Sequence, residues 1–200
     1  ERLISDFKIN YIKNKLRILN IYNLGQKLNH RLYNISLGKK FTNGFIRNEH
    51  DVLEISDRDF IKQNRVFGFK KVQDKFQDYL IETFKNYNPN FLFFGHTNNI
   101  NLETFDALKN INKSLIISQW NEDPIMPSLK DSKLNIDKIL KYKNYTDHTF
   151  ITTDPSVFNK HDRNLKNIHF CFIPVDKNIE SYEVYKLNPR NDLFLSLIHI

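Results

Sequence analysis

Residues 91–95 read FLFFG and residues 114–120 read SLIISQW, and these two apolar runs decide the fold. Each run is short, rich in Ile, Leu or Phe, and bounded by polar residues, which is typical of a β-strand. Neither run alternates strictly between apolar and polar side chains, so we expect both faces of each strand to be buried. Strands of this kind belong to parallel sheets that carry helices on both faces.

Further apolar runs of the same character lie at residues 16–22, 51–56, 148–152 and 169–173. Amphipathic helical patterns separate the runs; they lie at residues 31–48, where Gly38 and Gly44 interrupt the pattern, and at 71–87, 101–111 and 133–145. The alternation predicts an α/β domain with a Rossmann-like, doubly wound parallel sheet. We expect the strands at 16–22, 91–95 and 114–120 to be central.

The predicted domain covers residues 16–190. Residues 1–15 form an apolar and basic lead-in, for which a helix is expected. The chain starts at Glu1 and stops inside the apolar run 193–200. We therefore expect a piece of a longer protein, in which residues 191–200 begin the linker to a second domain.

Composition narrows the classes of function. The net charge is +7 over 200 residues, but lysines are dispersed among acidic side chains, so solvated faces are favoured over a nucleic-acid surface. No apolar run approaches ~18 residues, so no transmembrane segment is expected. Cys171 is the only cysteine, which favours a reducing, cytoplasmic location. Peripheral association with the inner face of the membrane is the alternative.

Ligands of doubly wound sheets bind beyond the carboxyl ends of the strands, so the residues after each strand are the candidate site. The first of these loops, residues 23–26, reads NLGQ and has a single glycine. It lacks the G-x-G-x-x-G spacing that lets a backbone approach a pyrophosphate, and the chain has no Walker motif. An NAD or ATP site is therefore not expected.

The second loop, residues 56–59, reads SDRD. Asp57 or Asp59 can hold the hydroxyl groups of a sugar, and Arg58 can meet an anion. A surface turn in which Arg58 pairs with the neighbouring acids explains the same residues equally well.

The third loop begins at Gly95, where a backbone without a side chain can pass close to a ligand. His96 follows where a general base would act, with Thr97 beside it. The alternative is a half-buried turn residue that leads into a helix capped by Asn101.

The fourth loop, residues 118–124, brings the only tryptophan together with two carboxylates and two amides: Trp120, Glu122, Asp123, Gln119 and Asn121. Carboxylates can hold sugar hydroxyls or take a proton, and the indole face can stack on a pyranose. A helix cap at Asp123 before Pro124 is the alternative. The histidines are scattered, with no His-x-x-x-His pair and no second cysteine, so no metal site is expected.

Residues 40–52, KFTNGFIRNEHDV, resemble the first helix and following strand of GT-B glycosyltransferases. More narrowly, they resemble family 1-type enzymes related to spore-maturation proteins, in which N-G-F and R-N-G-H elements precede a strand ending in S-D-R-D. Residues 118–124 resemble the family's W-x-x-D element. Further similar stretches are residues 151–154, 173–176 and 191–194. Glu49 stands in place of the family's glycine, and residues 196–200 depart from its pattern.

The resemblance implies the N-terminal, acceptor-side half of a glycosyltransferase, with a second domain that holds most of the nucleotide-sugar donor. It implies metal-independent transfer to a sugar, lipid or protein acceptor, with the nucleotide sugar as co-substrate and no other cofactor. The catalytic candidates are His96, Asp123 and Asp57. The acceptor-binding candidates are Asn43, Gly44, Arg47, Arg58, Asp59, Thr97, Trp120, Asn121, Glu122 and Thr153.

We expect His96, Asn121 and Asp123 to share one rim of the sheet, with Asn43 and Arg47 approaching the same cleft. This chain alone is expected to be inactive, because half of the cleft is missing. Three alternative functions remain: a non-catalytic ligand-binding or scaffold domain, a nucleic-acid-binding module, and half of a sugar-nucleotide epimerase.

Overall fold

A computed structural model of the chain describes residues 15–26, 35–65, 69–126, 128–160 and 167–180. Its centre is one six-stranded sheet in which every pair of neighbours is parallel. The strands are β1 (Arg17–Tyr22), β2 (Asp51–Ser56), β3 (Phe91–Gly95), β4 (Ile116–Asn121), β5 (His148–Ile151) and β6 (Ile168–Phe170). The predicted fold class and the six predicted strands are confirmed.

The strand order is β2-β1-β3-β4-β5-β6, so the three strands expected at the centre each have a neighbour on both sides. The order reverses between β1 and β3, as in flavodoxin-like doubly wound sheets. The chain steps from β1 to β2 in one direction and then crosses back to build β3 to β6 in the other. The carboxyl ends of β1 and β3 therefore flank the switch point, where such sheets bind ligands.

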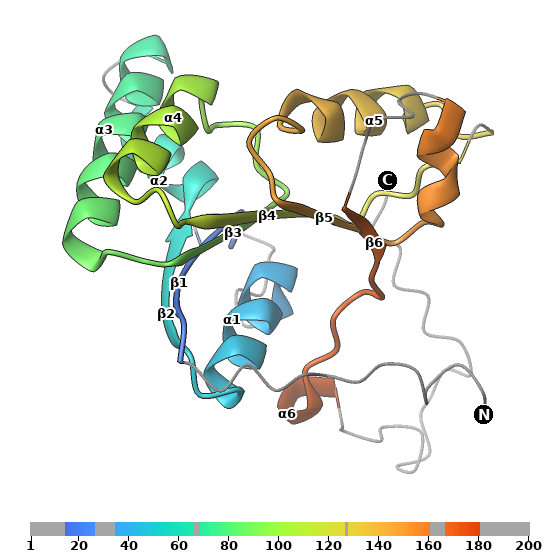
Figure 1. Cartoon of the computed structure of the whole chain (residues 1–200), viewed down its shortest axis with the longest axis horizontal. Helices are drawn as coiled ribbons and strands as arrows, with labels where there is room; N and C mark the ends of the chain where they lie inside the picture. The colour runs from blue at the N-terminus through green and yellow to red at the C-terminus, as the bar shows by residue number, and fades with distance from the viewer. Residues whose placement is uncertain (1–14, 27–34, 66–68, 127, 161–166, 181–200) are drawn as a thin grey trace.

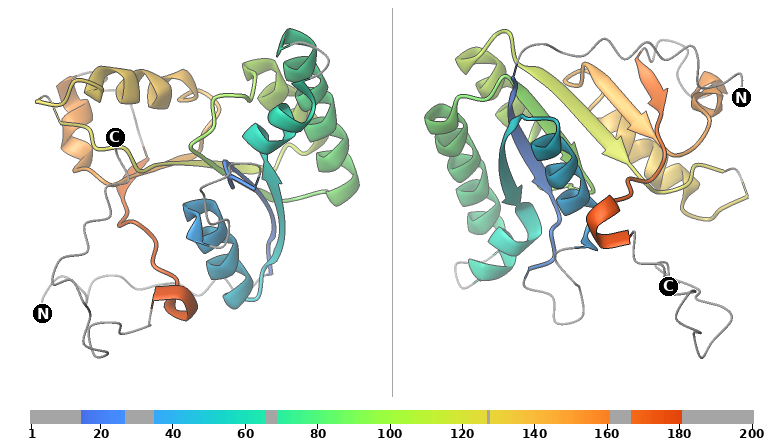
Figure 2. Two further views of the ribbon diagram at one scale, coloured as in Figure 1. Left: turned by 180° about the vertical axis from the view of Figure 1, so that it is seen from behind. Right: turned by 90° about the horizontal axis from the view of Figure 1, so that it is seen from below.

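The helices are α1 (Leu37–Arg47), α2 (Asp57–Gln63), α3 (Phe69–Tyr87), α4 (Leu102–Ile111), α5 (Ser132–Lys141), the 3₁₀ helix η3 (Pro155–Lys160) and α6 (Lys177–Glu180). Helices α3, α4 and α5 lie on one face of the sheet and α1 lies on the other, with α6 beside α1 (Figures 1 and 2). Right-handed crossovers explain the division, because the step from β1 to β2 runs opposite to all later steps.

The core follows the alternation of side chains along the strands. Leu19 and Ile21 of β1 join the cluster under α3 and α4, whereas Ile18 and Tyr22 join the cluster under α1. A third cluster lies between α5 and η3 and includes Ile151. Both faces of β1 are thus buried, as its mostly apolar sequence predicts.

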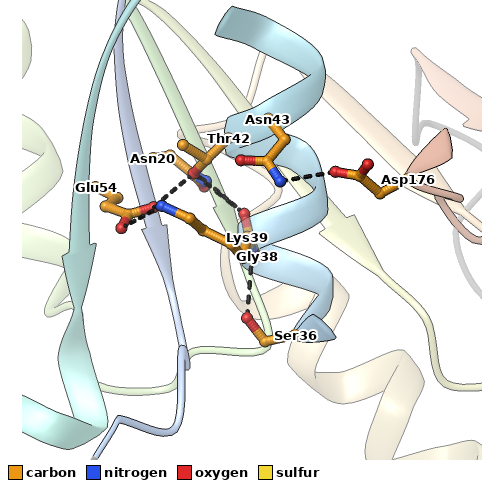
Figure 3. Close-up of polar contacts among 8 residues, drawn as sticks. All are labelled: Asn20, Ser36, Gly38, Lys39, Thr42, Asn43, Glu54 and Asp176. Carbon is orange, nitrogen blue, oxygen red and sulfur yellow. Dashed lines mark hydrogen bonds and ion pairs between the residues drawn. The ribbon is translucent and has the colours of Figure 1, made fainter. Parts of the chain in front are cut away.

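Polar contacts fix α1 on the sheet (Figure 3). Asn20, fully buried in the middle of β1, donates from Nδ2 to the Gly38 carbonyl at 3.0 Å and to Thr42 Oγ1 at 2.8 Å. Thr42 Oγ1 in turn donates to Glu54 Oε2 at 2.9 Å, and Lys39 Nζ donates to Glu54 Oε1 at 3.0 Å. Most buried polar groups in folded proteins have a hydrogen-bond partner. The network therefore joins α1 to both β1 and β2.

The structure corrects several local predictions. Gly38 and Gly44 do not interrupt α1, which is continuous through both. Residues 57–59 form the first turn of α2, not a loop. Asp123 and Pro124 cap no helix, because α5 begins only at Ser132. The lead-in at residues 1–14 and the junction at 191–200 lie outside the described residues.

The ring of Tyr22 is packed between two glycines. A Cβ atom added to Gly38 would lie 2.6 Å from Tyr22 Cβ and Cγ, and one added to Gly95 would overlap the Tyr22 ring. The Tyr22 ring fills the space that a side chain at position 95 would need. The expectation that the Gly95 backbone can pass close to a ligand stays a prediction, since Gly95 also lines the pocket at the end of β3. Both glycines are needed because the Tyr22 ring packs directly against their backbone.

Two substitutions in α1 test this packing. Gly38→Ala is expected to lower the free energy of unfolding by about 1–3 kcal/mol, because the core must shift around the new methyl group. Gly44→Ala is the matched control: nothing lies within 4 Å of the added Cβ, so the helix should gain about 0.5–1 kcal/mol. Urea unfolding measures both changes. Equal stability of the two variants would show that Tyr22 does not restrict Gly38.

Candidate functional site

A narrow pocket opens at the carboxyl ends of β3 and β4, next to the switch point. Its lining includes His96 and Thr97 after β3, Asn121 and Asp123 at the end of β4, and Lys138 from α5. It encloses about 30 Å³, which is space for about one or two water molecules. A sugar-sized ligand would therefore have to lie across its mouth.

His96 of the pocket lining belongs to a chain of three side chains, one from the end of each of β1, β3 and β4. His96 Nδ1 lies 2.8 Å from Glu122 Oε1, and the hydroxyl of Tyr22 donates to Glu122 Oε2 at 3.1 Å. A carboxylate that accepts from Nδ1 holds the imidazole in the tautomer whose Nε2 carries the free electron pair. The arrangement therefore has the form of an oriented general base.

The protonation of Glu122 and Tyr22 suits this arrangement. Burial alone would raise the pKa of Glu122, but the hydrogen bond from His96, the charge that His96 carries when protonated, a backbone hydrogen bond and the Tyr22 hydroxyl outweigh it, and the net pKa is lowered. Burial, followed by the nearby Glu122 carboxylate, raises the pKa of Tyr22 well above its ordinary value. At neutral pH Glu122 is thus an ionised acceptor and Tyr22 a protonated donor.

The backbone of His96 is left-handed, with φ of 50°. Histidine is one of the residues found in this region more often than most, but the conformation still costs on the order of 1–3 kcal/mol. The turn comes directly after Gly95 and places the imidazole within hydrogen-bonding distance of Glu122. Strain of this kind clusters at functional sites.

Positive charge lies beside the second carboxylate of the pocket. Lys138 Nζ is 3.6 Å from Asp123 Oδ2, and Asn121 Nδ2 donates to the Asp123 carbonyl at 3.1 Å. Arg58 also lines the pocket. The structure therefore brings His96, Asn121 and Asp123 together at one rim, with two cationic side chains next to them.

Asp57 and Asp59 occupy structural positions. Asp57 is fully buried and accepts from Asn99 Nδ2 at 2.6 Å and from Thr97 Oγ1, which ties the start of α2 to the loop after β3. Asp59 accepts from Ser56 Oγ and, at 2.9 Å, from the Gln26 amide. Neither aspartate lines the pocket. The surface-turn alternative is also wrong, because both residues are buried in the first turn of a helix.

The α1 candidates lie away from the pocket. Asn43 Nδ2 donates to Asp176 Oδ2 at 2.7 Å, and Arg47 Nη2 lies 2.6 Å from Asp176 Oδ1 (Figure 3 shows the Asn43 contact). The Asp176 side chain is fully buried by these contacts. Asn43 and Arg47 thus join α1 to the segment before α6, and Gly44 lies between them on the same helix.

Two further candidates, Trp120 and Thr153, have structural roles. Trp120 is 2% exposed, and its ring packs edge-on against Phe41 with centroids 5.0 Å apart, so it presents no face to a pyranose. Thr153 Oγ1 accepts from the Ile125 amide at 3.0 Å and holds the loop after β4. The expected stacking on Trp120 is therefore wrong.

The sequence interpretation missed Tyr22 altogether and assigned Glu122 only to acceptor binding. The one local signal is that Tyr22 ends an apolar strand; its pairing with Gly95, the last residue of β3, is known only from the structure. The contact with Glu122 spans 100 residues and depends on the order of the strands, which local patterns do not give.

Among the described residues, no three His, Cys, Asp or Glu side chains are grouped so that they could hold a metal ion. The described part of the chain also has no helix of the length and apolar character needed to cross a membrane. No protein-family model matches this sequence, and no curated protein matches it.

The lowered pKa of Glu122 predicts a pH-dependent contribution to stability. A carboxyl group whose pKa is lower in the folded than in the unfolded chain stabilises the fold above its ordinary pKa of 4.5. The contribution is lost as the pH falls through the folded pKa. We expect the difference in free energy of unfolding between wild type and Glu122→Gln to be present at pH 6 and to shrink below about pH 4.5.

Denaturant unfolding at a series of pH values measures this difference. Tyr22→Phe serves as a second variant, because it removes one of the hydrogen bonds that lower the Glu122 pKa while it keeps the ring that fills the core. A difference that stays constant or grows on acidification would contradict the assigned ionisation.

Proposed function

We propose that this domain is the acceptor-side half of a glycosyltransferase that uses a nucleotide-sugar donor, with His96 as the general base. The observation that carries the proposal is the 2.8 Å contact between His96 Nδ1 and Glu122 Oε1 at the carboxyl edge of a doubly wound sheet. The resemblance of residues 40–52 and 118–124 to GT-B enzymes supports the same class.

In the proposed reaction, His96 Nε2 takes the proton of an acceptor hydroxyl as its oxygen attacks the anomeric carbon of the donor. The bond between that carbon and the nucleotide diphosphate breaks, and the diphosphate leaves with the bonding electron pair. Glu122 remains ionised, orients the imidazole and stabilises the imidazolium that forms. Transfer in this form inverts the configuration of the sugar.

The remaining polar groups of the pocket would position the acceptor. Asp123 and Asn121 can bind hydroxyl groups, and Lys138 and Arg58 place positive charge at the same rim. Asp57 is not retained as a base, because its carboxylate is buried behind Thr97 and Asn99. The diphosphate has to be stabilised largely by a second domain, so the 200-residue chain alone is expected to show no transfer.

Turnover by a protein that carries both this domain and a donor domain tests the proposal. His96→Asn removes the base but keeps a residue that tolerates a left-handed backbone, and it should lower kcat by about 10²–10⁴-fold. Glu122→Gln should also lower kcat. Asp123→Asn should lower turnover because it weakens binding of the acceptor. The thermal midpoint should change less than the activity in each case.

His50→Gln is the matched control, since His50 lies at the opposite end of β2 from the pocket. It should leave turnover unchanged. Normal turnover by a folded His96→Asn variant would make His96 a structural turn residue. Binding of saccharides without transfer by the two-domain protein would favour the non-catalytic alternative.

A further inference from the structure

Two histidines meet across the last two strands of the sheet. His148 of β5 and His169 of β6 lie diagonally across the strand pair, because Phe150 is the register partner of His169. His148 Nδ1 and His169 Nε2 share a hydrogen bond of 3.1 Å, in which the tautomers decide the donor, and the ring centroids are 5.3 Å apart. His169 is exposed and His148 is half-buried, so solvent reaches the pair.

We propose that His148 and His169 supply the two protein ligands of a site for a divalent transition-metal ion such as Cu²⁺, Ni²⁺ or Zn²⁺. Metal–nitrogen bonds of about 2.0–2.1 Å place two neighbouring imidazole ligands about 2.9–3.3 Å apart. The separation of 3.1 Å between the two ring nitrogens lies within that range. Imidazole is a preferred ligand of these three ions, whereas Mg²⁺ and Ca²⁺ require oxygen ligands.

The two rings are held by a rigid scaffold, because His169 lies in the strand that pairs with the strand of His148. The ladder continues past β6, where the Cys171 amide donates to the Ile151 carbonyl at 2.8 Å. Both ligands therefore project from paired strands, and little conformational entropy is lost when the ion binds.

The remaining coordination positions belong to water. Cys171 is two residues beyond His169, and its Sγ donates to the Phe172 carbonyl at 3.5 Å. Among the described residues no third ligand joins the pair. The site is thus an open, two-histidine site, separate from the His96 pocket.

The test is a titration of the full 200-residue chain with Cu²⁺ and with Zn²⁺, followed by calorimetry. One equivalent is expected to bind to the wild type. His148→Asn and His169→Asn should each weaken binding by about 10²-fold, because either change turns a two-point attachment into a one-point attachment. The double variant should bind at most a few-fold more weakly than the single variants, because each single change already removes the two-point attachment.

His50→Gln is the matched control and should bind as the wild type does. Circular dichroism and the thermal midpoint without metal establish that each variant is folded. A measurement on the wild type avoids the variants: the electron paramagnetic resonance spectrum of bound Cu²⁺ should show two equatorial imidazole nitrogens. Unchanged affinity in both single variants, or a spectrum with one imidazole nitrogen or none, would overturn the proposal.

Discussion

The packing of Tyr22 between Gly38 and Gly95 is the constraint on which the rest of the site depends. The ring can lie there only because neither glycine carries a side chain. Its position sets the place of the hydroxyl that binds Glu122, and Glu122 in turn holds His96. A shift of α1 or β3 against β1 would therefore be transmitted directly to the imidazole.

Apolar contacts alone do not determine where α1 sits along the sheet. Its apolar side chains, among them Phe41 and Phe45, pack against the rings of β3, and such contacts tolerate small displacements. Hydrogen bonds are directional, so the bonds from Asn20 to Gly38 and Thr42 fix both rotation and position. The contacts of Asn43 and Arg47 with Asp176 add a second attachment on the side of α1 toward α6.

The fold was largely predictable from the sequence because it depends on local patterns. Runs such as FLFFG are short, strongly apolar and bounded by polar residues, which predicts strands buried on both faces, and the helices between them imply parallel pairing. The site was predictable only to the level of strand ends. Trp120 shows why. Alternation along β4 places Trp120 and Gln119 on opposite faces of the sheet, but the sequence does not show that Phe41 of α1, which is distant in the chain, covers the indole ring.

Charged residues were the hardest to assign, because their roles depend on partners that are distant in sequence. Asp57 and Asp123 both follow strands and look equivalent in the sequence, yet one is enclosed by Thr97 and Asn99 and the other faces the pocket. Arg47 and Asp176 are 129 residues apart, and no local pattern relates them. Contacts between residues that are distant in the sequence, not residue type, decide which carboxylates remain available for chemistry.

Under the proposed function, the division of the site among three strands has an energetic consequence. His96 pays a conformational cost for its left-handed backbone, and the hydrogen bond from Nδ1 to a buried, ionised Glu122 offsets it. Since Glu122 is itself held by Tyr22 and, through its carbonyl, by Thr152 Oγ1 at 2.9 Å, the base is oriented before any acceptor arrives. Catalysis by a positioned base depends on orientation before the acceptor binds, because an imidazole that folding has already oriented needs no reorientation in the transition state.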